Sequence, residues 1–224
     1  MKVTYLFHSC YYVEFEDKVL IFDYYQGKLP SFSTDKKIYF FVSHSHYDHF
    51  NDKIFDMYKD HDVKYFVSSD CFVEQRDNVF TLLIDDYIEV DDIKIKTLRS
   101  TDLGVAYLVY TNKKSIYHAG DLNAWCFEEN KENDNEFMEF LYSKELDKLK
   151  GEDIDIAFVP LDSRLKKNAY RGIELFLEKN QPKYLFPMHM WNNFKVVEKF
   201  SKLTDYKGFV SVICNNFSTV IEEI

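Results

Sequence analysis

The chain has 224 residues, of which 46% are hydrophobic and 18% aromatic. This is enough to bury a substantial core, so disorder is not the default interpretation. Lys and Arg number 28 against 38 Asp and Glu, a net charge of −10, which on average repels a polyanion such as duplex DNA. We therefore expect residues 1–224 to form one domain, or two tightly fused halves, that acts on small or locally docked substrates.

The cysteines and the hydropathy pattern bear on the compartment. Cys10, Cys71, Cys126 and Cys214 lie far apart with no C-x-x-C pair, which argues against a zinc knuckle or a disulfide framework. Residues 1–8 lack the apolar segment of a signal peptide, and no apolar run approaches the ~20 residues that span a membrane. The sequence predicts a cytoplasmic protein with reduced cysteines and leaves its oligomeric state open.

Short β-branched and aromatic runs open the chain and favour an antiparallel meander. The run at 38–42 is almost continuously apolar, as in a strand buried on both faces, and it leads directly into a histidine-rich loop. Asn51 can cap a helix that carries Ile54, Phe55 and Tyr58 on one face. The strands expected in this half of the chain are 3–7, 11–15, 19–22, 38–42 and 65–67.

From 79 to 120 the pattern predicts an antiparallel sheet with hairpins at Asp91-Asp92 and at 111–114. Residues 128–150 are highly charged, yet apolar residues recur at helical spacing, which predicts an amphipathic surface helix. These apolar residues are Phe137, Phe140, Leu141, Leu146 and Leu149. Strands at 154–159, 184–186 and 209–213 should alternate with helices near 169–179 and 194–203. Without a glycine-rich phosphate loop, this order favours an α/β fold of the four-layer αββα type over a doubly wound fold.

The loop after the apolar strand reads His44-Ser45-His46-Tyr47-Asp48-His49. In an extended loop, residues i and i+2 project to one side, so His44 and His46 can offer nitrogen to one cation. Asp48 and His49 then face a second cation, because the backbone turns at this point. The alternative is a polar loop whose histidines bind nothing.

This H-x-H-x-D-H string resembles the signature of the metallo-β-lactamase superfamily, and the resemblance runs the length of the chain. It implies that Asp121 bridges two metals, with Gly120 allowing close backbone approach, and that His189 is a ligand of the second metal. Residues 6–9 and 20–23 are similar to segments in the branch that contains sugar-phosphate lactonases and the N-acylphosphatidylethanolamine phospholipase D.

One family histidine is missing, because the corresponding stretch reads Leu98-Arg99-Ser100-Thr101-Asp102-Leu103-Gly104. Asp102 and His118 are the candidates to complete the first metal site; otherwise Asp102 caps a turn and His118 packs beside a strand end. His8 is a further pocket candidate, whereas His61 is expected to be solvated in a charged loop.

Other residues near the predicted site have two interpretations each. Asp162 can orient a ligand histidine and Arg164 can hold an anionic substrate group, or the two can form a structural salt bridge. Trp125 and Trp191 can wall a pocket or pack in the core.

The resemblance implies one or two Zn²⁺ ions per chain, with Mn²⁺, Fe²⁺ or Ni²⁺ as alternatives, and a metal-bound hydroxide as the nucleophile. Asp48 and Asp121 are the expected catalytic carboxylates. We expect a hydrolase of a small phosphodiester, phosphorylated lactone or related ester. Two alternatives stay open: a non-catalytic metal-binding or metal-sensing domain, because one histidine is missing, and an RNA-processing nuclease of the same fold, which the net charge disfavours.

Overall fold

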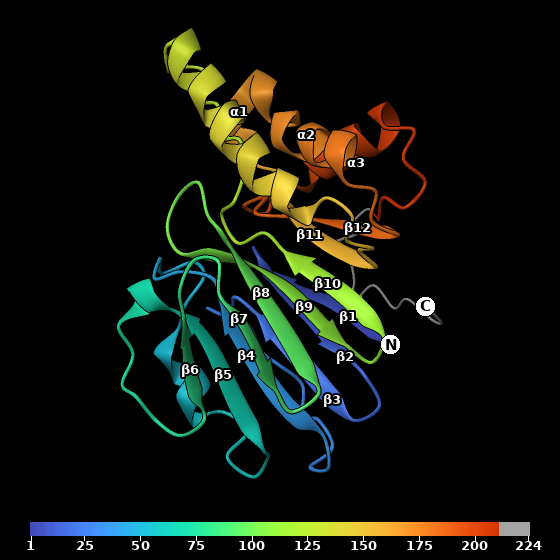
Figure 1. The fold of residues 1–224 in the computed structure, drawn as a ribbon. Helices are drawn as coiled ribbons and strands as arrows, with labels where there is room; N and C mark the ends of the chain where they lie inside the picture. Colours follow the sequence, from blue (N-terminus) through green and yellow to red (C-terminus); the bar gives the residue numbers. More distant parts are fainter. Residues whose placement is uncertain (211–224) are drawn as a thin grey trace. The chain divides into compact units, whose positions relative to one another are not determined.

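The computed structural model describes residues 1–210, which divide into two compact units: Met1–Leu83 and a second unit that begins at Ile84. Each unit contains one mixed six-stranded sheet, and both sheets can be followed in Figure 1. The expected α/β class is therefore confirmed. Among the described residues, no helix combines the length and the apolar character needed to cross a membrane.

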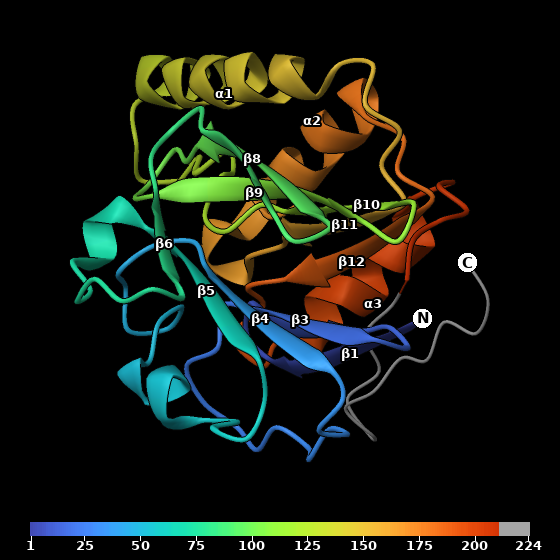
Figure 2. The same cartoon turned by 60° about the horizontal axis from the view of Figure 1, so that its bottom comes forward.

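The first sheet has the strand order β1-β2-β3-β4-β5-β6. The first three strands form the expected antiparallel meander, and β3 to β6 run parallel. Figure 2 shows β4, β5 and β6 side by side. The strands are β1 (Lys2–Phe7), β2 (Cys10–Glu14), β3 (Lys18–Phe22), β4 (Lys37–Val42), β5 (Val63–Ser68) and β6 (Val79–Leu82).

The strand at 79 was expected to begin an antiparallel sheet, and this expectation is wrong. Val79 pairs with Tyr65, so β6 is a parallel edge strand of the first sheet. The intervening segment, which includes η2 (Ser69–Cys71), returns the chain to the same end of the sheet. The residue pattern of a short strand gives its burial but not the direction of its partner, because the side chains alternate in both cases.

Strand β4 is buried on both faces, as its sequence predicts. On one face Phe41 stacks between Phe22 of β3 and Phe66 of β5, with ring centroids 4.7 and 5.0 Å apart. On the other face Phe40 stacks on Tyr65 at 5.5 Å. Such pairs contribute ~0.5–1.5 kcal/mol each beyond the burial of their area. They hold β3 and β4 in the register Phe22↔Phe41, which sets the level at which the two strands end.

The segment after Asn51 forms a 3-10 helix, η1 (Asp52–Asp56), and not the expected α-helix. The cap itself is confirmed, since the Asn51 side chain accepts a hydrogen bond from the backbone N–H of Lys53 at 3.0 Å. Ile54 is the helix residue that is buried. Phe55 and Tyr58 pack against the same core while partly exposed, and Tyr58 lies beyond the end of the helix.

The second sheet has the order β12-β11-β10-β9-β8-β7. Both expected hairpins are present, with two-residue turns at Asp91-Asp92 and Asn112-Lys113. Asn112 and Lys113 have φ of 49° and 59°, as in the turns that match the right-handed strand twist. The strands are β7 (Tyr87–Val90), β8 (Ile93–Arg99), β9 (Val105–Thr111), β10 (Lys114–His118), β11 (Ile156–Pro160) and β12 (Tyr184–Met188).

Helices of the second unit gather around β11 and β12 (Figure 1). They are α1 (Glu132–Leu146), η3 (Asp147–Leu149), η4 (Ser163–Asn168), α2 (Arg171–Lys179) and α3 (Phe194–Leu203). The helices expected near 169–179 and 194–203 are thus confirmed. The strand expected at 209–213 lies mostly outside the described residues, as does Cys214; within them, Phe209 forms a single bridge with Leu185.

Helix α1 does not present the expected amphipathic face. Phe137 and Phe140 are 60% and 54% exposed, and the buried apolar residues are Tyr142 and Leu146 near its end. Only the C-terminal part of α1 is buried. The spacing of apolar residues therefore predicts the helix but does not identify which of its turns pack against the rest of the unit.

Candidate metal centre

In the first unit, the predicted site residues follow strands that end at one edge of the sheet. Strands β1 and β3 are both antiparallel to β2, and β3 is parallel to β4. These three strands therefore point the same way, and His8, Asp23 and Ser43 come directly after them. The topology brings one residue from each strand end to the loop that carries the histidine motif.

Asp23 connects the residues at this edge by hydrogen bonds. Its Oδ1 accepts a hydrogen bond from the backbone N–H of Ser43 at 2.7 Å, and its Oδ2 accepts from the Ser43 hydroxyl at 2.7 Å. The same Oδ2 lies 2.8 Å from Nδ1 of His49. A carboxylate accepts only, so Nδ1 of His49 carries the proton and Nε2 is the nitrogen that can bind a metal.

His44 is oriented by the same network. Its Nδ1 lies 2.9 Å from the Ser43 hydroxyl, whose proton is donated to Asp23. The hydroxyl must then accept from His44, which makes Nε2 the nitrogen that can bind a metal here too. Hydrogen bonds of this kind fix the tautomer and raise the basicity of metal-binding histidines.

Distances between adjacent donor atoms match a shared ion. Nε2 of His44 lies 3.0 Å from Nδ1 of His46, and Nε2 of His8 lies 3.3 Å from Oδ2 of Asp48. Two ligands of a tetrahedral zinc ion with bonds near ~2.1 Å stand roughly 3.4 Å apart. The separations within both pairs are therefore of the size that one ion imposes.

Asp48 is held in its ionised form. Burial favours the neutral carboxyl, but the hydrogen bond from His8 and the charge of His49 outweigh burial and lower the pKa of Asp48 to about 2. An ionised carboxylate is the form that binds a cation.

In the second unit, β10, β11 and β12 are parallel, so their carboxyl ends also meet at one edge. Asp121, Asp162 and His189 follow these three strands. Nδ1 of His189 lies 2.9 Å from Oδ2 of Asp162, and Nε2 lies 3.3 Å from Oδ1 of Asp121. The arrangement repeats that of His49: a carboxylate holds Nδ1, and Nε2 is the nitrogen that can bind a metal.

The two carboxylates change the acidity of His189. Burial disfavours the imidazolium, but the charges of Asp121 and Asp162 and their hydrogen bonds outweigh burial and raise the pKa of His189 to about 9. In the metal-free protein this histidine therefore carries a proton near neutrality, in the position where a cation would otherwise balance both carboxylates.

Arg164 contacts Asp162 and completes this arrangement. Its Nε and Nη2 donate to Oδ2 of Asp162 at 2.8 and 2.6 Å, and its guanidinium lies 5.0 Å from the ring centre of Trp191. Of the two interpretations of this pair, the structure shows the salt bridge, with Asp162 also orienting His189. The Arg164 side chain is half exposed, so its outer edge borders solvent.

Thr101 joins the loop that lacks the family histidine to the loop that carries Asp121. Its hydroxyl donates to the carbonyl of Asn123 at 2.6 Å and accepts from the Asn123 N–H at 2.9 Å. Trp125 fixes the same loop, since its Nε1 donates to the Asp121 carbonyl at 2.8 Å. Asp102, next to Thr101, offers a carboxylate oxygen within 4.8 Å of the Asp121 carboxylate.

His118 differs from Asp102 in its surroundings. It is fully buried, its Nδ1 accepts from the backbone N–H of Gly120 at 3.2 Å, and its ring packs on Phe158. These contacts match the strand-end packing interpretation, so Asp102 is the better candidate to complete the first site. His61 lies elsewhere in the first unit and is partly buried, with both ring nitrogens shielded from solvent and its ring 5.3 Å from that of Tyr58, so the expectation that it is solvated is wrong.

Several site residues have left-handed backbone conformations. His8, Asp23 and His189 have φ of 54°, 46° and 65°. Residues other than glycine rarely adopt these angles, which cost on the order of 1–3 kcal/mol each and cluster at functional sites. Each of the three follows a strand directly, where the backbone must turn sharply to leave the sheet.

The sequence interpretation missed the roles of Asp23, Ser43 and Thr101. Asp23 ends the strand before the motif strand, and this position is the signal that indicates it: in a parallel pair, carboxyl ends meet at one edge. Thr101 gives no comparable signal, because a threonine in a polar loop is common.

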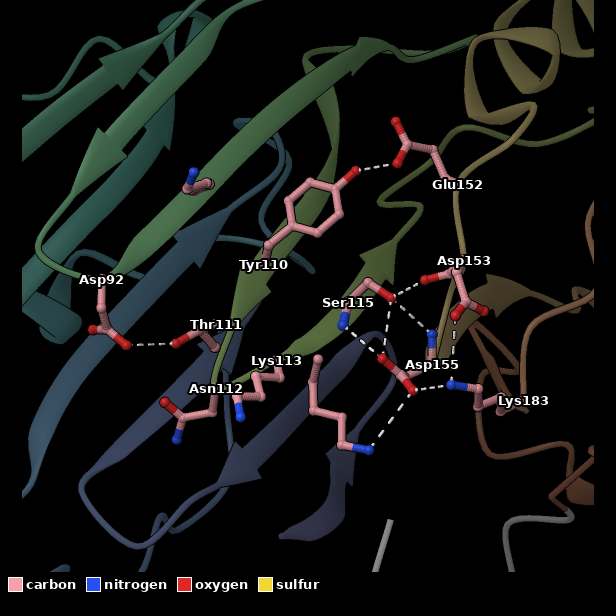
Figure 3. A pocket seen from close by; sticks show the side chains of 12 residues that line it. Asp92, Tyr110, Thr111, Asn112, Lys113, Ser115, Glu152, Asp153, Asp155 and Lys183 are labelled. Carbon is pink, nitrogen blue, oxygen red and sulfur yellow. Dashed lines mark hydrogen bonds and ion pairs between the residues drawn. The ribbon is translucent and has the colours of Figure 1, made fainter.

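A separate pocket of about 500 Å³ lies in the second unit, shown in Figure 3. Its centre is Asp155, which is contacted by Ser115, Lys114 and Lys183. Tyr110 donates to Glu152 at 2.5 Å on the same wall. The charged side chains of this pocket form ion pairs with one another. These pairs connect β10 to the segments that precede β11 and β12, so we interpret the pocket as structural.

Comparisons with known proteins place this chain in a family. A family model described as a beta-lactamase superfamily domain matches residues 2–137, which is more than half of the chain. The chain therefore belongs to the metallo-β-lactamase superfamily.

Solved structures share the fold at low sequence identity. The metallo-hydrolase Igni18 from Ignicoccus hospitalis is 16% identical with a TM-score of 0.60, over 100% of this chain and 99% of that one. The metallo-β-lactamase fold protein YhfI from Bacillus subtilis is 12% identical with a TM-score of 0.63, over 99% of each chain. The diiron β-hydroxylase CmlA from Streptomyces venezuelae is 10% identical with a TM-score of 0.55, over 84% of this chain and 44% of that one. These similarities concern the fold and leave the substrate open.

Proposed function

We propose that this chain is a metal-dependent hydrolase. The observation that supports the proposal is common to three histidines: His44, His49 and His189 each have Nδ1 within hydrogen-bond distance of an oxygen, and we propose that Nε2 binds the metal. Buried carboxylates that hold two of these histidines are a feature of metal sites, where they set both tautomer and orientation.

The assignment of ligands to ions follows the family resemblance. We assign His44, His46 and Asp121 to a first ion, with Asp102 in place of the missing histidine. Asp48, His49, His189 and the shared Asp121 are assigned to a second ion. Because the ligands come from both halves of the sequence, we propose that residues 1–224 act as a single metallo-hydrolase domain.

The proposed donors fit a divalent cation of the zinc type. Imidazole nitrogens and carboxylate oxygens suit Zn²⁺, and they also suit Fe²⁺, Mn²⁺ and Ni²⁺. We propose zinc, one or two ions per chain, and note that CmlA, which shares the fold, is a diiron protein. Such an ion supplies a water of lowered pKa, near ~7 for zinc, and polarises the substrate oxygen.

The chain's own residues position the reaction. Asp48, with its low pKa, stays ionised and can accept a hydrogen bond from a nucleophilic water, while Asp121 contributes the second carboxylate. Asp162 keeps His189 in one orientation, and Arg164 holds Asp162 in turn. These residues supply placement and charge, which account for much of the rate enhancement in hydrolytic sites.

We propose a small phosphodiester, phosphorylated lactone or related ester as the substrate class. The support is the similarity of residues 6–9 and 20–23 to the branch of lactonases and phospholipases, together with a net charge of −10 that disfavours nucleic acid. A cytoplasmic location fits the reduced state expected of the cysteines.

Metal-dependent turnover tests this function. The purified chain, stripped with chelator and reloaded with Zn²⁺, Mn²⁺ or Fe²⁺, is assayed with bis(p-nitrophenyl) phosphate and with a simple lactone. We expect turnover that returns on reloading and that His49→Ala abolishes, with His61→Ala as the matched control. Metal uptake without turnover on either substrate class would favour a metal-binding or sensing domain, and absence of metal uptake would refute the site.

A further inference from the structure

We infer that His8 is an additional metal ligand, which binds the same ion as Asp48 and His49. The inference rests on the proposed function for the presence of the ion. His8 follows the first strand, forty residues before Asp48 in the sequence. It would therefore add a donor from outside the histidine motif.

The donor atoms of these three residues converge. His8, Asp48 and His49 each offer an atom that lies within 4.8 Å of the other two. Nε2 of His8 is 3.3 Å from Oδ2 of Asp48. The ring of His8 also meets that of His49 edge to face, with centroids 5.6 Å apart. Two imidazoles and a carboxylate this close together can occupy three neighbouring positions around one ion, which with His189 and Asp121 would be five-coordinate.

The backbone holds His8 in this place at a cost. Its φ of 54° is left-handed, and its backbone N–H donates to the hydroxyl of Tyr5 at 2.8 Å. The side chain is 1% exposed and packs against the edge of Tyr25 at 6.2 Å. A strained, buried and hydrogen-bonded backbone fixes the direction of the side chain, as a metal ligand requires.

A simpler role for His8 is a hydrogen bond to Asp48 without contact to the ion. The variant His8→Gln distinguishes the two roles. The glutamine amide can donate a hydrogen bond to Asp48, but it is a poor replacement for imidazole as a zinc ligand. If His8 is a ligand, the second ion gains one nitrogen donor beyond those that the family resemblance implies. The second ion should then bind more tightly than the first.

The test measures metal binding directly, on the full chain. Wild type, His8→Gln and His8→Ala are stripped and titrated with Co²⁺, whose visible absorption reports ligand number, and the zinc forms are examined by X-ray absorption to count imidazoles. His61→Gln is the matched control, since it removes a histidine of the same unit away from the motif. Circular dichroism and thermal unfolding of the stripped proteins verify that each variant is folded.

We expect His8→Gln and His8→Ala to weaken one equivalent of metal by about tenfold or more, to change the Co²⁺ spectrum and to lose one imidazole from the count. His61→Gln should behave as wild type. If His8→Gln keeps wild-type affinity and spectrum, His8 is not a ligand, and the hydrolase proposal stands on its own. If wild type binds no metal, both proposals fail. If His8→Gln loses the metal but wild type shows no turnover, the inference stands and the hydrolase proposal falls.

Discussion

Three of the proposed ligand histidines share one feature, which is an oxygen within hydrogen-bond distance of Nδ1. Nδ1 contacts Asp23 in His49, the Ser43 hydroxyl in His44 and Asp162 in His189. In each case the oxygen beside Nδ1 orients the ring, so that Nε2 is the nitrogen we assign to the metal.

His46→Ala and His49→Ala should each abolish metal-dependent hydrolysis while the protein stays folded, because we propose that these imidazoles coordinate the ion. Turnover of bis(p-nitrophenyl) phosphate and the circular dichroism spectrum measure the two properties. Full activity in either variant would contradict the site.

Asp121→Ala should reduce activity more than Asp162→Ala. The first substitution removes a ligand assigned to both ions, and the second removes a partner of His189, which typically costs ~10–100-fold in affinity or activity. Comparison of kcat/KM and metal content for both variants ranks the two roles. The reverse order would show that Asp121 does not bridge.

The stability of the metal-free protein should fall as the pH rises from 6.5 to about 9. The pKa of His189 is raised from its ordinary value of 6.5 to about 9 by the charges of Asp121 and Asp162, so its stabilising contribution is complete below pH 6.5 and is lost as the pH passes the folded-state value. At ~1.4 kcal/mol per pKa unit, the loss is at most about 3 kcal/mol.

Urea unfolding of the chelator-treated protein at pH 6 and pH 9.5 measures this change, and His189→Gln, which lacks the titrating group, is the control. Metal affinity should rise over the same range, because the proton competes with the ion. Stability that increases with pH in wild type relative to the variant would contradict the assignment.

At the scale of elements, strand ends and the partners of hairpin-connected strands were predictable, and the partners of strands far apart in the sequence were not. The apolar run of β4 and the motif after it predict both the buried strand and the ligands that follow. The direction of β6 and the 3-10 form of η1 were not predicted, since both depend on tertiary pairing and packing. Asp23 was missed for the same reason: its contact with His49 comes from a residue 26 positions away.

The loop that lacks the family histidine shows most clearly what the sequence does not predict. Its sequence offers Asp102 as a ligand or as a turn cap, and residue type cannot decide between them. The hydrogen bonds of Thr101 to Asn123 bring this loop to Asp121, and such a contact between two loops leaves no periodic pattern in the sequence.

Thr101→Val should weaken metal binding by releasing this contact, whereas Thr111→Val should not. Thr111→Val removes a threonine hydroxyl that donates to Asp92 at 3.0 Å in the same unit, away from the site. Each hydrogen bond lost should cost about 1 kcal/mol of unfolding free energy. Isothermal titration with Zn²⁺ and urea unfolding separate the two effects. Equal metal affinity in both variants would show that the loop position does not matter.

At the scale of the whole molecule, the ligands are held by bonds internal to each unit. Asp23 and Ser43 hold the motif loop in the first unit, and Asp162 with Arg164 holds His189 in the second. The six-stranded sheets carry the core independently of any ion. This differs from small zinc domains, whose folding free energy is supplied by the metal.

Removal of metal should therefore lower the melting temperature without unfolding the protein. An ion at a hundredfold excess over its Kd stabilises by ~2.7 kcal/mol, and each kcal/mol corresponds to ~2–4 °C for a protein of this size. We expect a decrease of roughly 5–10 °C per ion, with an unchanged far-ultraviolet circular dichroism spectrum at 25 °C. His49→Ala should show a smaller decrease on chelation than wild type, because the ion that His49 is proposed to bind is already absent from the variant. If chelation abolishes the native spectrum, the ligand network does not hold itself in place and the ion must supply the folding free energy.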